Sequence, residues 1–289
     1  MSAEQLPADL ARQVETALQE DIGSGDVTAA LVPATQQVRG RVIARDEAVL
    51  CGRPWVDATF RQLDARVQLT WHVREGAPLS ANTTVFDIAG PARAVLTGER
   101  TALNFLQLLS GTATVTRRYA QAVAGTHCRI LDTRKTIPGL RTAQKYAVRC
   151  GGGDNHRMGL FDRVLIKENH IAAAGSITQA IGAARRNAPE IKVEVEVESL
   201  GELREALDAG PDIIMLDDFS LQDLHGAVAM NRAHAVPVKL EASGSVTLES
   251  VRAIAATGVD YVSIGSLTKH LHAVDLSMRL DFIQDPGER

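Results

Sequence analysis

The chain has 289 residues, of which 45% are hydrophobic and 23% charged, a composition typical of a folded globular protein and not of a disordered or fibrous one. Its formal net charge of −4 gives no long-range attraction to nucleic acid or to an anionic membrane surface. The sequence shows no long apolar run and no signal peptide. Its three scattered cysteines fit neither a disulfide framework nor a paired-cysteine zinc site. We therefore expect a cytoplasmic protein.

The first 110 residues read as an α+β module. A helical pattern over Asp9–Glu20 is followed by two alternating segments, Val38–Ala44 and Val67–Val73, which predict strands. A leucine-rich helical pattern over Glu99–Leu109 then leads toward a second domain. At this length we expect two domains.

From about Cys128 the pattern becomes regular, because short β-branched runs alternate with amphipathic helical segments. Six strands are predicted, over Arg129–Asp132, Arg163–Lys167, Lys192–Val197, Asp212–Leu216, Val238–Glu241 and Asp260–Ile264. Helix starts are indicated by Ser199 with Glu202, by Ser220 with Asp223, and by Thr247. Six units favour an open or incomplete α/β barrel over a closed eight-stranded one, and a doubly wound sheet is the alternative.

Polar side chains follow every predicted strand, at the ends where barrel enzymes have their active sites. These residues are Asp132-Thr-Arg134-Lys135, Lys167-Glu-Asn-His170, Glu194 to Glu198, Asp217-Asp218, Glu241 to Ser245, and Gly265-Ser266. Arg134, Lys135, Arg157 and Lys167 form a dense group of cations, and guanidinium groups bind carboxylates and phosphates in bidentate fashion. The predicted site therefore binds a polyanion.

Period two places Glu194, Glu196 and Glu198 on one face of their strand. We expect cations such as Lys167 to face these carboxylates across the barrel mouth, and a divalent cation to be shared by Glu196 and Asp217. The alternative is an edge strand with one face in solvent.

Glycine-rich turns precede several of the helical segments. Gly244, next to Ser243, and Gly265 stand before helices, so backbone N–H groups there are predicted to bind phosphate. Gly151-Gly-Gly153 precedes His156 and Arg157 but matches no established phosphate-binding motif.

Taken together, these motifs resemble the quinolinate phosphoribosyltransferases, type II phosphoribosyltransferases, over nearly the whole chain. The resemblance rests on Glu20 to Thr28, Gly98 to Asn104, Asp132-Thr-Arg-Lys-Thr136, Gly151 to Arg157, Leu165 to His170, Met215-Leu-Asp-Asp218 and Glu241-Ala-Ser-Gly244. One departure is Ser245, where many relatives have a second glycine.

The resemblance implies an N-terminal α+β sandwich domain over residues 1–110, an incomplete six- to seven-stranded α/β barrel over 111–270, and a return of 271–289 to the first domain. It also implies a homodimer in which the N-terminal domain of one subunit closes over the barrel mouth of the other. Assembly of dimers into hexamers is left open.

The implied reaction is that of a pentosyltransferase: phosphoribosyl pyrophosphate and quinolinate give nicotinate mononucleotide, CO₂ and pyrophosphate in NAD biosynthesis. By the resemblance, quinolinate is bound by Arg134, His156, Arg157 and Lys167, with Arg100 from the partner subunit. The donor is bound by Lys135, Glu196, Asp217, Ser243, Gly244 and Gly265. Lys167, Glu196 and Asp217 are the implied catalytic groups, and Glu196 and Asp217 the implied ligands of Mg²⁺.

Three other functions stay open at this point. The first is a paralogue of the same fold, associated with molybdate transport, that has a different substrate. The second is a non-catalytic sensor of NAD precursors. The third is a phosphate-binding aldolase, in which Lys167 would form a Schiff base and would need a depressed pKa.

Overall fold

A computed structural model describes residues 6–283, which form two compact units. Within this range, the first unit contains residues 6–115, 137–152 and 270–283, and the second contains 116–136 and 153–269. The long helix α3 (Ala92–Ala122) begins in the first unit and ends in the second, so the predicted boundary after residue 110 falls inside a helix. Residues 1–5 and 284–289 of the predicted domains lie outside the described residues.

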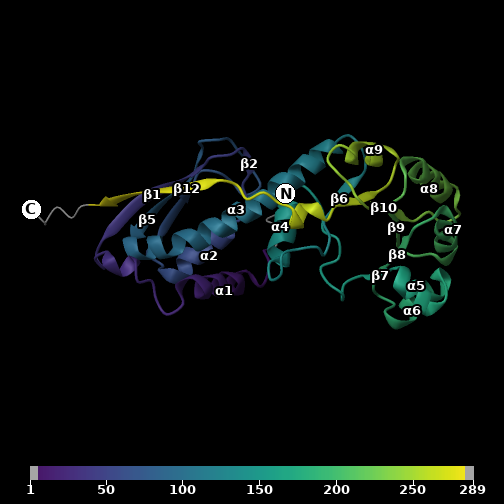
Figure 1. Ribbon diagram of the computed structural model, residues 1–289, viewed down its shortest axis with the longest axis horizontal. Helices are drawn as coiled ribbons and strands as arrows, with labels where there is room; N and C mark the ends of the chain where they lie inside the picture. Colours follow the sequence, from purple (N-terminus) through teal and green to yellow (C-terminus); the bar gives the residue numbers. More distant parts are fainter. Residues whose placement is uncertain (1–5, 284–289) are drawn as a thin grey trace, which may run out of the picture. The chain divides into compact units, whose positions relative to one another are not determined.

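The first unit is built on a four-stranded antiparallel sheet in the order β12-β1-β5-β3 (Figure 1). Its strands are β1 (Gln37–Ala44), β3 (Gln68–Trp71), β5 (Thr84–Pro91) and β12 (Leu276–Ile283), with the short pair β2 (Ala48–Val49) and β4 (Pro78–Leu79) beside them. Its helices, besides the start of α3, are α1 (Leu10–Ile22), α2 (Arg53–Leu63), α4 (Arg141–Gly151) and the 3₁₀ turn η1 (Ala29–Leu31). The last described strand, β12, pairs with β1 along its whole length.

None of the strands predicted for this unit covers β5, which ends in Gly90 and Pro91, residue types that are typical of turns. Pro91 is the last residue of the strand, where a missing N–H matters least. A Cβ at Gly90 would lie 2.9 Å from the Cα of Val67, so the close approach of the chain there requires glycine.

Apolar side chains of the sheet pack against α2 and α3 to form the core of this unit. Phe60 and Leu103 from these helices and Val42 and Phe86 from β1 and β5 are all essentially inaccessible to solvent. A second cluster, around Trp55 and Tyr146, joins α1, α2 and α4. Burial of side chains of this size contributes about 1.5–3 kcal/mol each.

The second unit contains a six-stranded parallel sheet in the order β6-β11-β10-β9-β8-β7. Its strands are β6 (Arg129–Leu131), β7 (Val164–Ile166), β8 (Val193–Val197), β9 (Ile213–Asp217), β10 (Lys239–Ser243) and β11 (Tyr261–Ser263). All six predicted strands are confirmed, with ends shifted by one or two residues. The doubly wound alternative is wrong, because its strand order would reverse within the sheet, whereas here the last strand pairs with the first.

Helices cover the outside of this curved sheet, as Figure 1 shows for α5 to α9. They are α5 (Glu168–Ala174), α6 (Ile177–Asn187), α7 (Leu200–Ala209), α8 (Leu221–Ala233), α9 (Val251–Ala256) and α10 (Ser266–Lys269). The predicted caps are confirmed where Ser199 and Ser220 accept hydrogen bonds from the N–H groups of Glu202 and Asp223.

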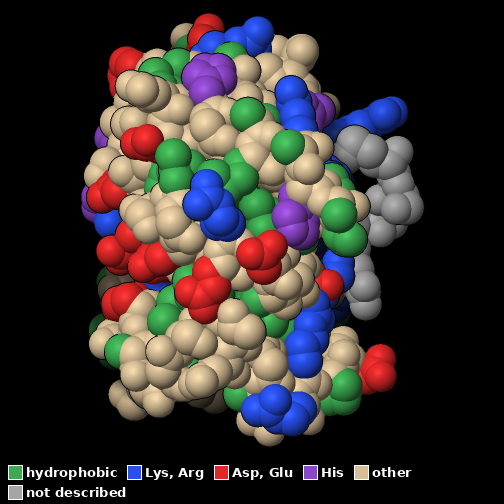
Figure 2. All heavy atoms as spheres, turned by 90° about the vertical axis from the view of Figure 1, so that its right-hand side faces the viewer, with side chains coloured by type: hydrophobic (Ala, Val, Ile, Leu, Met, Phe, Trp, Pro, Cys, Tyr) green, Lys and Arg blue, Asp and Glu red, His purple; other side chains and the backbone are tan. Residues whose placement is uncertain are grey.

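The outer face of this unit, turned toward the viewer in Figure 2, carries acidic and basic side chains interspersed among apolar ones. This pattern is typical of helices with one face in solvent and the other against a sheet. No helix among residues 6–283 is long and apolar enough to cross a membrane.

The barrel is open between β6 and β7, the two edge strands of the sheet. Asp154 lies along the free edge of β6 and forms a parallel bridge with Leu131. Its N–H donates to the carbonyl of Ile130 (2.8 Å), and its own carbonyl accepts from the N–H of Asp132 (3.2 Å). The loop that follows α4 thus satisfies backbone groups of an edge strand, which is one way that proteins protect such edges.

Candidate active site

A cavity of about 270 Å³ lies at the carboxyl ends of the barrel strands, entirely within the second unit. Its lining comprises Thr133, Arg134, Lys135, His156, Arg157, Leu165, Lys167, Glu196, Met215, Asp217, Glu241, Ser243 and Ser263. Every predicted site residue lines it except Gly244 and Gly265, which lie in adjoining turns, and Arg100. Arg100 is exposed on α3 in the first unit.

Two guanidinium groups line this cavity. Arg134 follows β6, and Arg157 lies on the loop that crosses the open edge of the barrel. Partial burial, together with the charge of Arg134, lowers the pKa of Arg157. The two positive charges therefore interact, and an anion bound in the cavity would offset their repulsion.

Lys167 and Glu196 form an ion pair at the ends of β7 and β8, as predicted. Glu196 is mostly buried, whereas the Lys167 side chain remains partly accessible from the cavity. Asp217, at the end of β9, lines the same cavity. Two carboxylates from the neighbouring strands β8 and β9 therefore border it.

The interpretation of β8 as a half-solvated edge strand is wrong. β8 lies between β7 and β9, and all five of its residues are buried. Glu194 is fully buried and does not pair with Lys167; it faces the guanidinium group of Arg163, with Nη1 to Oε2 at 3.0 Å. Glu198, expected on the same face, lies beyond the strand and is exposed.

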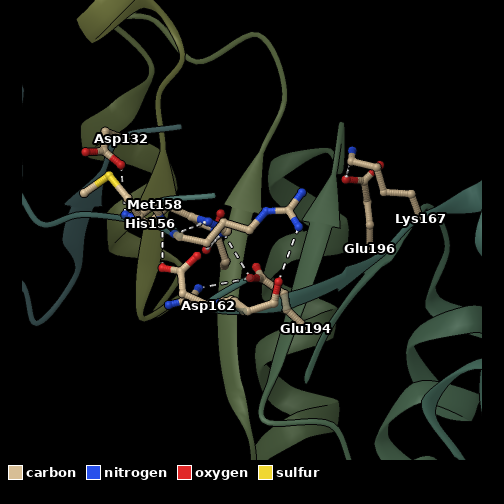
Figure 3. Close-up of polar contacts among 10 residues, drawn as sticks. Asp132, His156, Met158, Asp162, Lys167, Glu194 and Glu196 are labelled. Carbon is tan, nitrogen blue, oxygen red and sulfur yellow. Dashed lines mark hydrogen bonds and ion pairs between the residues drawn. The ribbon is translucent and has the colours of Figure 1, made fainter. Parts of the chain in front are cut away.

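His156 is buried beneath the cavity, and both of its ring nitrogens face protein groups (Figure 3). Nδ1 accepts a hydrogen bond from the N–H of Arg157 at 2.8 Å, and Nε2 lies 3.0 Å from Oε2 of Glu194. With Nδ1 acting as an acceptor, Nε2 is the ring nitrogen directed toward Glu194. The imidazole therefore connects a buried carboxylate to the backbone of Arg157.

Glu241 is a second buried acid in this layer, 3.6 Å from His156 Nε2. Burial and the adjacent charge of Glu194 hold the pKa of Glu241 well above its usual value. Burial acts in the same direction on Glu194, but contacts with His156 and Arg163 outweigh it and lower the pKa of that group. The opposite directions of these two pKa shifts favour the proton on Glu241 over Glu194.

Asp132 fixes the loop that carries His156 and Arg157. It is fully buried at the end of β6; Oδ1 accepts from the N–H of His156 (2.9 Å) and Oδ2 from the side-chain amide of Asn155 (2.6 Å). Further along the loop, Asp162 accepts from the N–H groups of Met158 (2.7 Å) and Gly159 (2.9 Å) (Figure 3). Two aspartates thus set the backbone on either side of Arg157.

The two predicted phosphate turns are tightly packed. Gly244 has φ +105°, and a Cβ there would lie 2.2 Å from Oδ1 of Asp218. Gly265 faces Lys135, whose Cδ would be 2.9 Å from an added Cβ. The helix expected after Thr247 begins later, at Val251, because Thr247 and Ser250 form a turn of their own in which side chain and backbone exchange hydrogen bonds.

Sequence reasoning missed a set of residues that support this site from below: Asp132, Arg163, Glu194 as a partner of His156, and Glu241. Asp132 and Glu241 were recognised only as the ends of strands. The available signal was a charged side chain inside an otherwise apolar strand, because buried carboxylates require partners.

The chain was compared with known proteins. The family model for the N-terminal domain of quinolinate phosphoribosyl transferase matches residues 26–110, and that for the C-terminal domain matches residues 112–279. A probable nicotinate-nucleotide pyrophosphorylase [carboxylating] of Bacillus subtilis is 43% identical over 260 residues, 90% of this chain and 89% of that protein. The corresponding Mycobacterium leprae protein is 43% identical over 280 residues, 94% of this chain and 98% of that one. The solved structure of the nicotinate-nucleotide pyrophosphorylase from Francisella tularensis superposes with a TM-score of 0.90 at 46% identity, covering 96% of this chain and 98% of that one.

Proposed function

Since the chain belongs to the quinolinate phosphoribosyltransferase family, we infer that it transfers the phosphoribosyl group of phosphoribosyl pyrophosphate to quinolinate. The products are nicotinate mononucleotide, CO₂ and pyrophosphate, and the reaction belongs to NAD biosynthesis. The curated relatives carry names for this activity.

The observation that carries the residue assignments is the division of the cavity into a cationic and an acidic side. Arg134, Arg157 and Lys167 come from the end of β6, the loop across the open edge and the end of β7, whereas Glu196 and Asp217 come from the neighbouring strands β8 and β9. Quinolinate has two adjacent carboxylates, which the two guanidinium groups can bind in bidentate fashion. Lys167 then binds quinolinate at the border with the acidic side, where the ribose would lie.

The acidic side suits the ribose at the moment of transfer. As pyrophosphate leaves C1, the ribose gains oxocarbenium character, and the carboxylates of Glu196 and Asp217 stabilise that positive charge. The quinolinate nitrogen, held in line by its carboxylates, attacks C1. The adjacent carboxylate then leaves as CO₂, because the quaternised ring nitrogen stabilises the electron pair left on the neighbouring carbon. A proton from solvent then bonds to that carbon and gives nicotinate mononucleotide.

The donor's phosphates fit the remaining polar groups. Lys135, Ser243 and the turns at Gly244 and Gly265 lie at the rim beside Asp217. Two carboxylates at the ends of neighbouring strands suit Mg²⁺, which binds proteins through one or two carboxylates plus substrate oxygens. Glu196 and Asp217 would hold it, and when bound it supplies positive charge to the leaving pyrophosphate.

His156 acts chiefly on Arg157 in this proposal. Its Nδ1 and Nε2 are engaged by Arg157 and Glu194, so it sets the position of the arginine backbone and presents its ring to quinolinate.

Arg100 completes the carboxylate site from a second subunit of a homodimer, a role that fits its exposure on α3. A cytoplasmic location is part of the proposal, and the three cysteines, buried as thiols, fit a reducing compartment.

The decisive assay supplies the protein with phosphoribosyl pyrophosphate, Mg²⁺ and either quinolinate or nicotinate. Quinolinate should give nicotinate mononucleotide and CO₂ in equal amounts, and nicotinate, with one carboxylate, should give almost none. Equal use of nicotinate would contradict the two-carboxylate assignment, and lack of turnover with quinolinate would refute the proposed function.

Lys167→Ala and Arg134→Ala should each lower turnover by at least about 100-fold, the scale expected when a preorganised charge is removed from an active site. Lys239→Ala is a matched control, because Lys239 stands at the opposite end of a barrel strand and pairs with Asp260. Its turnover should stay close to that of the unmodified protein. Comparable losses in all three variants would indicate general destabilisation.

A further inference from the structure

A second cluster of reactive side chains lies in the first unit, outside the barrel. Cys51, Glu75 and Cys150 each place one ligand atom within 4.8 Å of the others. Cys51 lies between β2 and α2 and is fully buried, and Cys150 lies in the last turn of α4 and is 7% exposed. Because these two thiols are far apart in the sequence, no paired-cysteine motif could reveal their contact.

Neighbouring groups hold the cluster in place. The N–H of Cys51 donates to Oγ of Ser110 at 3.0 Å, and the same hydroxyl donates to the Cys51 carbonyl at 3.1 Å. Both oxygens of Glu75 accept backbone N–H groups at the start of α2, from Gly52 at 2.7 Å and from Arg53 at 3.2 Å. Secondary contacts of this kind orient the ligands of metal sites.

The hydroxyl of Tyr146 adds a fourth polar group to the cluster. It lies one helical turn before Cys150 on α4 and contacts Glu75. Cys51, Cys150 and Tyr146 are all buried, so water has little access to the space between these groups.

We propose that Cys51, Cys150 and Glu75 bind one thiophilic divalent cation, with the ligand set of a zinc site. Two thiolates and a carboxylate suit Zn²⁺ and are poor ligands for Mg²⁺. Zn–S bonds of about 2.3 Å place tetrahedral donor atoms roughly 3.5–3.8 Å apart. The three ligand atoms here lie within 4.8 Å of one another, so small side-chain shifts bring them to that spacing. The hydroxyl of Tyr146, one helical turn before Cys150, or a water molecule completes the coordination.

The test uses the full chain, reduced, freed of metal and titrated with Co²⁺. A thiolate-to-metal charge-transfer band should saturate at one equivalent, and added Zn²⁺ should abolish it by displacement. Cys51→Ser and Cys150→Ser should each lose the band, and Glu75→Gln should weaken binding about 10-fold or more. Cys128→Ser is the matched control, because this third cysteine is buried in the second unit, and it should bind as the unmodified protein does.

A measurement on the unmodified protein guards against variants that fail to fold. Zn²⁺ should raise its unfolding temperature and that of Cys128→Ser alike, because the ion binds only the folded state. The absence of a band in the reduced protein would overturn the proposal, as would a band that survives in both Cys51→Ser and Cys150→Ser. An oxidant-induced Cys51–Cys150 disulfide without metal binding in the reduced form would also overturn it, by indicating a redox pair.

Discussion

Replacing Gly244 with alanine isolates the close approach that shapes the turn proposed to bind the donor's phosphate. The new Cβ would lie 2.2 Å from Oδ1, 2.9 Å from the backbone nitrogen and 3.0 Å from Cα of Asp218. Rotating the Asp218 side chain would relieve only the first of these contacts. The backbone of Asp218 has little freedom to retreat, because it already has a positive φ of 55° and its N–H donates to the carbonyl of Ser243.

The expected magnitude has two parts. Left-handed backbone geometry costs an alanine about 1–2 kcal/mol, and overpacking against a fixed neighbour costs a further 1–3 kcal/mol or so. Gly210→Ala is the matched control, because Gly210 also has a positive φ, +69°, but no heavy atom lies within 4 Å of its added Cβ. Gly210→Ala should therefore lose only the cost of the left-handed backbone geometry, about 1–2 kcal/mol of unfolding free energy.

Urea unfolding of the unmodified protein, Gly244→Ala and Gly210→Ala measures the loss of stability in each variant. Steady-state kinetics measures the effect on substrate binding. Gly244→Ala should lose about 2–5 kcal/mol and Gly210→Ala about 1–2 kcal/mol. The KM for phosphoribosyl pyrophosphate should rise in Gly244→Ala alone, with the KM for quinolinate much less affected. Equal losses of stability in the two variants would show that the turn absorbs the methyl group, and the reasoning from close packing would fail.

Two further predictions concern the layer beneath the cavity. Asp132→Asn replaces one of the two carboxylate oxygens, which accept hydrogen bonds from the His156 N–H and the Asn155 amide, with an N–H donor. The KM for quinolinate should rise about 10-fold or more because Arg157 is misplaced, while the circular dichroism spectrum stays unchanged. An unaltered KM would show that Asp132 does not position Arg157. Glu241 has a raised pKa in the folded state, so the stability that its proton confers is complete below about pH 4.5 and is lost as the pH rises toward the folded pKa. Glu241→Gln removes this loss. Urea unfolding should therefore show that the free energy of unfolding of the variant, relative to that of the unmodified protein, rises by up to about 1.4 kcal/mol per pH unit above pH 4.5. A difference between the two proteins that stays constant from pH 5 to 8 would show that Glu241 is ionised.

The sequence predicts the barrel well because its physical signals are local. Each strand is a short apolar run and each helix has its own cap, as at Ser199, and neither requires knowledge of distant contacts. The polar strand ends converge for a geometrical reason, since the carboxyl ends of parallel strands meet at one edge of the sheet. The Lys167–Glu196 pair follows from the same argument.

The layer beneath the site lay outside such reasoning, because its contacts depend on where a loop folds. His156 reaches Glu194 because the segment from Asp154 to Asp162 crosses the edge of the barrel. Arg163, directly before β7, reaches the same carboxylate through the pairing of β7 with β8. The strand β5 was missed for a related reason: the sequence shows Gly90 and Pro91 but not the neighbouring Val67 that makes glycine necessary. Tertiary context overrides local preference at such positions.

The open edge between β6 and β7 has a consequence for how activity is acquired during folding. The segment that bridges this edge at Asp154 also carries His156 and Arg157, and Asp132 at the end of β6 accepts a hydrogen bond from the N–H of His156. Docking of this segment would therefore bring Arg157 to the cavity that Arg134 lines. A partly folded barrel with the segment undocked would lack one of the two arginines proposed to bind quinolinate.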